Sequence, residues 1–196
     1  MNKYHLIIIA VLLLSVVALS FLKINKNQVV DNITTYSSTE LGFQFEYPTG
    51  PDGYVLDERF PSETRDNNIR IINLVQTKDQ ENLDAGNVPI GGEGPATITF
   101  SIFENVKNQF PLAWAMENIA YSNINLKRGD TLETVVGGAN AIRYFADGLY
   151  ASDNVVVAHG DAIYMLTGMY LEEDSNLRRD FSTIVESITF IPQSSQ

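Results

Sequence analysis

The stretch Leu41–Pro48, which reads LGFQFEYP, decides the fold class of this chain. Aromatic side chains alternate with polar ones from Phe43 to Tyr47. Successive side chains of a β-strand point to opposite faces, so this alternation predicts a strand with one buried face. Pro48 cannot donate a hydrogen bond to a sheet and marks the end of the strand. The turn-forming residues Thr49–Gly53 follow it.

Comparable apolar or alternating segments recur along the chain and predict further short strands. They lie at Gly53–Leu56, Ile69–Gln76, Thr97–Phe103, Thr131–Val136, Ala141–Ala146, Val155–His159, Ala162–Leu171 and Thr189–Ile191. Gly160-Asp161 has glycine first, as a two-residue type II′ hairpin turn requires. The polar, glycine-rich segment Thr77–Pro95 is expected to be a long loop.

Two helices are expected beside these strands. The first runs from Pro111 to about Ile124, with an apolar stripe expected to face the sheet and composed of Leu112, Met116, Ile119 and Ala120. The second is capped at Asp174 or Ser175 and ends at Ser187, and its apolar stripe is Leu177, Phe181, Ile184, Val185 and Ile188. These elements predict one α+β domain over 39–192, an antiparallel sheet flanked by at least two helices, with a short tail at 193–196.

A different kind of segment precedes the domain. Leu6–Leu22 has no charged residue and is almost long enough to cross a bilayer as a helix. It predicts either an uncleaved membrane anchor, which we favour, or a signal peptide cleaved before Phe21. Residues 23–38 predict a polar tether whose end can join the sheet. A short N-terminus before a long folded chain predicts that the domain lies outside the cytoplasm, on the cell membrane or secreted.

Charge and composition exclude several functions. All 24 acidic residues and ten of the 13 basic residues lie at or after Asp31, which gives this region a formal charge of −14. Such a domain repels nucleic acid. The chain has no cysteine, so disulfides, thiolate metal sites and a cysteine nucleophile are excluded.

No motif in the sequence indicates a catalytic centre, a cofactor or a metal site. His159 is the only histidine after the N-terminal segment, and it lies beside a predicted turn. Two groups of acids remain possible calcium ligands: Asp79, Glu81 and Asp84 in the expected loop, and Glu172, Glu173 and Asp174 before the last helix. Zinc lacks the histidines and cysteines that it prefers.

The pair Trp114 and Tyr121 is the candidate contact site for a partner protein. The two residues lie a heptad apart, on the side of the first helix opposite Leu112. If Leu112 faces the sheet, both aromatic rings face solvent and can be buried by a partner in the cell envelope. The alternative is that the long loop or the tether covers them.

Three of these stretches together resemble the PsbP-like family. They are the opening Leu41–Pro48, the hairpin that ends in Ala162-Ile163-Tyr164, and the closing Phe181–Phe190. The resemblance covers Thr39–Pro192 and implies an antiparallel sheet with helices on its faces. It also implies an accessory or binding role rather than an enzyme. The family's usual tryptophan after the opening Tyr-Pro is absent, and Tyr54 is the nearest aromatic residue.

The sequence therefore predicts a non-catalytic, membrane-anchored, extracytoplasmic accessory or binding domain. Its expected partners are the membrane, through Leu6–Leu22, and a protein of the envelope. The alternatives are an exported hydrolase that uses His159 or a pair of carboxylates, and a calcium-binding envelope protein.

Overall fold

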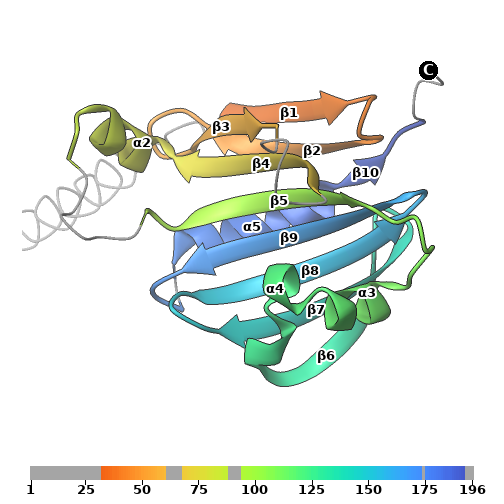
Figure 1. Ribbon diagram of the computed structural model, residues 1–196. Coiled ribbons are helices and arrows are strands. Elements are labelled where there is room, and N and C mark those ends of the chain that lie inside the picture. The colour runs from red at the N-terminus through yellow and green to blue at the C-terminus, as the bar shows by residue number, and fades with distance from the viewer. Residues whose placement is uncertain (1–31, 61–67, 88–93, 174, 193–196) are drawn as a thin grey trace, which may run out of the picture. The chain divides into compact units, whose positions relative to one another are not determined.

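Two antiparallel sheets form the domain (Figure 1). The computed structural model describes residues 32–60, 68–87, 94–173 and 175–192. The large sheet has the order β3 (Tyr54–Arg59), β4 (Asn68–Gln76), β5 (Thr97–Glu104), β9 (Ala162–Tyr170), β8 (Ala151–His159), β7 (Ala139–Asp147) and β6 (Lys127–Val136). The small sheet has the order β1 (Asn32–Ser38), β2 (Phe43–Thr49) and β10 (Thr189–Phe190). The expected antiparallel α+β architecture is confirmed.

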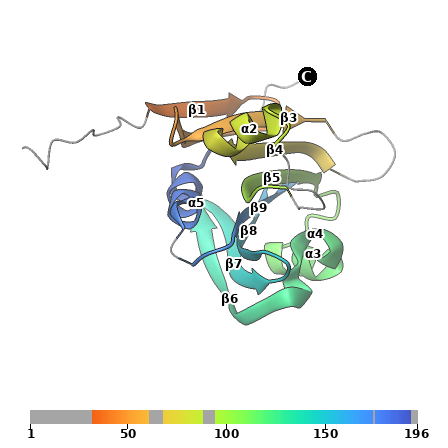
Figure 2. The same cartoon turned by 90° about the vertical axis from the view of Figure 1, so that its left-hand side faces the viewer.

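The two faces of the large sheet are covered by different elements. One face meets β2 and the helix α5 (Asn176–Ser187), where Phe45 of β2 stacks on Phe100 of β5 with 4.3 Å between ring centroids. The opposite face carries α3 (Pro111–Glu117) and α4 (Ile119–Ser122), followed by the 3-10 turn η1 (Ile124–Leu126). Figure 2 shows α5 and the α3–α4 pair on opposite sides of the sheet. Burial on both faces explains why several strand segments are apolar without clean alternation.

Helix α5 is the element that the sequence predicts most closely. Ser175 is its N-cap, and the Ser175 side chain accepts a hydrogen bond from the backbone N–H of Arg178 at 3.3 Å. The whole predicted stripe is buried: Leu177, Phe181, Ile184, Val185 and Ile188. The hairpin at Gly160-Asp161 is also confirmed, since His159 pairs with Ala162 and only the glycine of the turn has a positive φ.

Phe181 of α5 lies directly on the backbone of β9. A Cβ atom added at Gly168 would lie 2.6 Å from Cγ and 2.9 Å from Cδ2 of the Phe181 ring. Both distances are far below van der Waals contact, so only glycine allows the helix to approach this closely. Gly168 therefore fixes the height of α5 above the sheet.

Tyrosine hydroxyls connect the covering elements to the large sheet. Tyr164 of β9 donates to the Leu41 carbonyl at 2.6 Å, and Tyr144 of β7 donates to the Ser122 carbonyl at the end of α4. Tyr54 of β3 donates to Asp180 of α5 at 3.0 Å. Burial raises the pKa of Tyr164 to about 12 and the pKa of Tyr144 above its ordinary value. These hydroxyls therefore remain protonated donors at neutral pH.

One segment agrees with the sequence-based expectation and another differs from it. Residues 32–38, the end of the predicted tether, join the sheet as expected: they form β1 and pair with β2 along its whole length. The first part of the expected loop is the helix α2 (Thr77–Asp84), which buries no residue. A helix without a buried face leaves no apolar period in the sequence. An i,i+4 hydrogen bond from Gln80 to Asp84 supports it at 2.8 Å.

Within the described ranges, no helix is long and apolar enough to cross a membrane. The predicted anchor Leu6–Leu22 lies outside these ranges.

The contact between Gly168 and Phe181 predicts that Gly168→Ala destabilises the protein. The added methyl group would displace Phe181 from a packed site, which typically lowers the free energy of unfolding by about 1–3 kcal/mol. Urea unfolding followed by circular dichroism measures this change. Gly94→Ala is the matched control, because nothing lies within 4 Å of a Cβ atom added at that position. Equal stability of the two variants would contradict the assigned contact.

Candidate functional site

A cavity lies beside α5, on the face of the large sheet that this helix only partly covers. Helix α5 contacts β9, β5 and β2, while β8, β7 and β6 continue beyond it to the edge of the sheet (Figure 1). The cavity has a volume of about 320 Å³ and lies between α5 and these three strands. We call it the α5 cavity.

Strand register brings the lining side chains to one face of the sheet. Arg143 pairs with Val155 of β8 and with Leu132 of β6, and residues directly opposite each other share a face. The sheet contributes Arg128 and Leu132 from β6, Arg143 and Phe145 from β7, and Asp153 and Val155 from β8. The helix contributes Arg178, Phe181 and Ser182, and Asp130 lies at the rim on β6. The lining is therefore an apolar surface with charged groups placed on it.

Arg178 and Asp153 form an ion pair across the boundary between helix and sheet. The Arg178 Nε atom donates to Asp153 Oδ2 at 2.7 Å, and its guanidinium carbon lies 4.9 Å from the centroid of the Tyr170 ring. The hydrogen bond with Asp153 raises the pKa of Arg178. Burial raises the pKa of Tyr170 to about 12, so its ring is neutral beside Asp153. This pair holds the first turn of α5 against β8.

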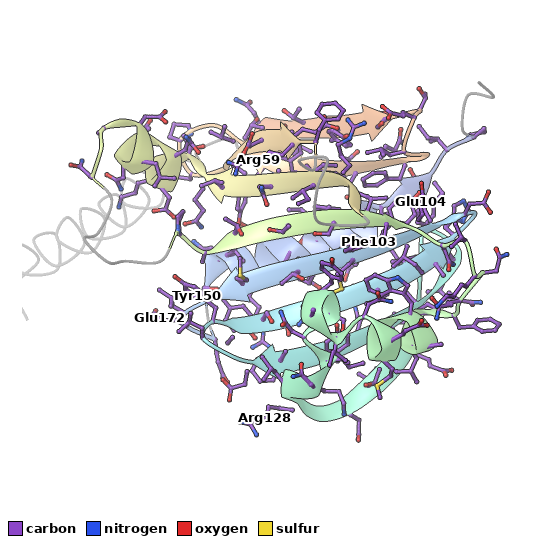
Figure 3. The ribbon with its side chains drawn as sticks, in the orientation of Figure 1. Arg59, Phe103, Glu104, Arg128, Tyr150 and Glu172 are labelled. Atoms are coloured by element: carbon purple, nitrogen blue, oxygen red, sulfur yellow. The ribbon has the colours of Figure 1, made fainter. Side chains whose placement is uncertain are left out.

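The other two arginines of the cavity differ in their partners. Arg128 Nε lies 3.4 Å from Asp147 Oδ2, and both side chains are exposed at the edge of the sheet; Figure 3 shows Arg128 there, at the opposite end of the sheet from Arg59. Arg143 is half-buried, and none of the residues described by the structure gives it a hydrogen bond or an ion pair. The α5 cavity thus contains one guanidinium group without a partner among the described residues.

No motif in the sequence marks Arg128, Arg143 or Arg178 as site residues. One sequence feature could have indicated Arg143: within the predicted strand Ala141–Ala146, it shares a face with the apolar residues Ala141 and Phe145. A charged residue between two apolar ones on a central strand is unusual, because such positions are normally buried. Both faces of β7 are apolar, however, so the pattern alone does not say which face is open.

The predicted contact site at Trp114 is corrected by the structure. Trp114 is only 3% exposed, and its ring packs 4.8 Å from the ring of Phe103 on β5. The stripe that was expected to face the sheet faces solvent instead, with Leu112 42%, Met116 61% and Ile119 48% exposed. The sheet, rather than a loop or the tether, covers Trp114. Tyr121 is half-buried, with its ring 5.0 Å from that of Phe103.

The predicted helix is divided in two, but both parts bury the same side. The division lies at Asn118, whose φ of −113° and ψ of 51° are not helical. The Trp114 carbonyl accepts from both the backbone N–H and the side chain of Asn118, each at 2.9 Å, at the end of α3. The buried side consists of Pro111, Trp114, Ala115 and Ser122, so the segment packs on the sheet with the side opposite the predicted stripe.

Within the described ranges, the remaining candidate residues are not grouped as a catalytic or metal-binding arrangement. His159 is exposed and stacks on Phe190 at 4.0 Å, and no described side chain hydrogen-bonds to it. Asp79, Glu81 and Asp84 lie on α2, while Glu172 and Glu173 lie between β9 and α5; Asp174 is outside the described ranges. Among the residues that the structure describes, no three histidine or acidic side chains are grouped as metal ligands.

The structure therefore defines an α+β domain with helices on both faces of an antiparallel sheet and an open charged cavity beside one helix. The chain belongs to the PsbP-like family: a family model described as PsbP-like protein matches residues 5–190. No curated protein matches the chain.

One solved structure shares this fold, and a second gives a weaker match. The solution structure of cyanobacterial PsbP (CyanoP) from Synechocystis sp. PCC 6803 matches with a TM-score of 0.53 and 11% sequence identity, over 85% of this chain and 97% of that chain. A crystal structure from Bacteroides thetaiotaomicron VPI-5482 matches with a TM-score of 0.46 and 10% identity, over 80% of this chain and 47% of that chain. At such identities the first likeness concerns the fold alone.

The position of Trp114 predicts that Trp114→Ala strongly destabilises the protein. Truncating a buried tryptophan lowers the free energy of unfolding by roughly 3–5 kcal/mol. Met116→Ala, two residues away on the exposed side of the same helix, should change stability by no more than about 0.5 kcal/mol. Urea unfolding must be followed by circular dichroism, because Trp114 is the only tryptophan. Similar stability of the two variants would contradict the burial of Trp114 and indicate that it is a surface residue.

Proposed function

We propose that this protein is a non-catalytic accessory or binding domain, held on the outer side of the cytoplasmic membrane by Leu6–Leu22. The observation that carries the binding role is the α5 cavity, an open site with an apolar lining and with Arg143, to which none of the described residues gives a hydrogen bond or an ion pair. Small-molecule sites typically combine apolar walls with a few polar groups in this way. Membership of the PsbP-like family supports the accessory class.

The arrangement of reactive groups favours binding over catalysis. Nucleophilic catalysis needs a nucleophile within hydrogen-bond reach of a base. The α5 cavity contains Ser182, but its hydroxyl is paired with Glu186 at 3.4 Å and its lining has no histidine. The carboxylate of Asp153 is occupied by Arg178. These groups can orient a ligand, and none of them is arranged to attack one.

The negative charge of the domain favours a position away from the lipid headgroups. The region from Asp31 onward carries a formal charge of −14 and is repelled by anionic lipid headgroups. An uncharged anchor joined by a tether would therefore hold the domain near the bilayer without pressing it against the headgroups. A partner protein would meet the exposed apolar side of α3, with Leu112 and Met116, rather than Trp114.

The chain contains no cysteine, so single-cysteine variants test its topology directly. We expect Lys78→Cys, at an exposed position on α2, to react with a membrane-impermeant maleimide in intact cells of a bacterial host. Asn2→Cys, on the other side of Leu6–Leu22, should react only after lysis. Both proteins should sediment with the membranes.

Two outcomes would contradict this topology. Labelling of Lys78→Cys only after lysis would place the domain inside the cell. Recovery of the protein from the medium with Phe21 as its first residue would replace the anchor with a cleaved signal peptide.

A further inference from the structure

Arg143, which lines the α5 cavity, differs in its partners from Arg70, a buried arginine elsewhere in the sheet. Arg70, 5% exposed on β4, donates to Glu58 and to Glu40 at 2.7 Å each. Two carboxylates thus compensate one buried guanidinium. Arg143 is half-buried on β7, and no described residue provides it with a carboxylate or a carbonyl. Removing a charge from water without a partner is unfavourable.

A ligand carboxylate is the group that would satisfy Arg143. A guanidinium group presents parallel N–H donors that match the two oxygens of a carboxylate, and such charge-assisted bonds are about twice as strong as neutral ones. The cavity keeps Arg143 open to a ligand while the other two arginines are paired with Asp153 and Asp147.

We propose that the α5 cavity binds a small organic monocarboxylate with an apolar body, whose carboxylate is held by Arg143. The body of the ligand would lie against Leu132, Phe145 and Phe181, which line the same cavity. This inference rests on the proposed binding function and names the class of ligand. A volume of about 320 Å³ is at the low end for small-molecule sites, which suits a compact ligand.

The charged residues around the cavity favour a ligand that carries a single negative charge. Asp130 and Asp153 belong to the lining, and Glu186 lines an adjoining cavity that also borders Arg143. These carboxylates would repel a phosphate dianion, and one unpaired guanidinium balances one charge. The acidity of the whole domain acts in the same direction, because long-range repulsion grows with the charge of the ligand.

The apolar lining favours a ligand with an apolar part over small ions such as acetate or chloride. Phe181 is 3% exposed and Val155 1% exposed, so the inner wall of the cavity is formed by core residues. Leu132, 64% exposed, forms the outer wall on the edge strand β6. Contact with these side chains would remove apolar ligand surface from water, whereas acetate or chloride offers little or no such surface.

The test uses the full chain in nanodiscs of zwitterionic lipid, titrated with 4-fluorophenylpropanoate and observed by ¹⁹F NMR, with empty nanodiscs as the blank. We expect saturable binding that is weakened about tenfold or more in Arg143→Met, because a hydrogen bond to a charged group is lost. Arg59→Met is the matched control, since Arg59 lies on β3 at the opposite end of the sheet (Figure 3). The neutral amide of the probe should bind at least about tenfold more weakly.

A second variant covers the case in which Arg143→Met alters the fold. Leu132→Asp changes a mostly exposed residue and adds a negative charge to the cavity wall, so it should weaken binding while leaving the circular dichroism spectrum unchanged. Absence of saturable binding, equal affinity in all variants, equal binding of the amide, or displacement of the probe by equimolar inorganic phosphate would each overturn the proposal. None of these results would alter the maleimide labelling that tests the anchored topology, so the two proposals fail separately.

Discussion

The contact between Phe181 and the backbone of Gly168 determines where this domain is closed and where it is open. Because β9 has no side chain at this position, α5 lies close to the sheet and buries its stripe between β9 and β2. The sheet, however, continues for three more strands beyond β9. The helix therefore forms one wall of a cavity instead of a complete cover, and the sheet face of β6, β7 and β8 forms the rest.

The covering elements remain in place through a few specific hydrogen bonds on an otherwise apolar core. Tyr54 fixes α5, Tyr164 fixes the turn before β2, and Tyr144 fixes the end of α4. Each donor lies on a strand of the large sheet, and each acceptor lies on an element that covers it. Apolar packing is non-directional, whereas these bonds define position. The ion pair between Arg178 and Asp153 has the same effect at the rim of the α5 cavity.

The elements that the sequence predicted correctly are those whose pattern of apolar and turn residues fits only one local structure. The stripe of α5, the hairpin at Gly160-Asp161 and the antiparallel α+β class are confirmed. The helix after Pro111 has apolar residues on two sides, and the packing of Trp114 on Phe103, a tertiary contact, decides which side is buried. Helix α2 buries no residue and leaves no apolar period in the sequence. Arg143 is open to a ligand because α5 covers only part of the sheet and because two nearby carboxylates pair with other arginines. Both features depend on tertiary packing and cannot be predicted from a local sequence pattern.

Partial cover of the sheet by α5 is proposed to create the binding site, and nuclear Overhauser contacts between ligand and methyl groups test this directly. The full chain in nanodiscs, labelled at leucine and valine methyls, contains a competing cavity of about 500 Å³ on the opposite face, lined by Leu112 and Val135. The aromatic protons of bound phenylpropanoate are predicted to contact the methyls of Leu132 and Val155. Contacts to Leu112 and Val135 instead would show that the ligand binds beside α3 and would contradict the account.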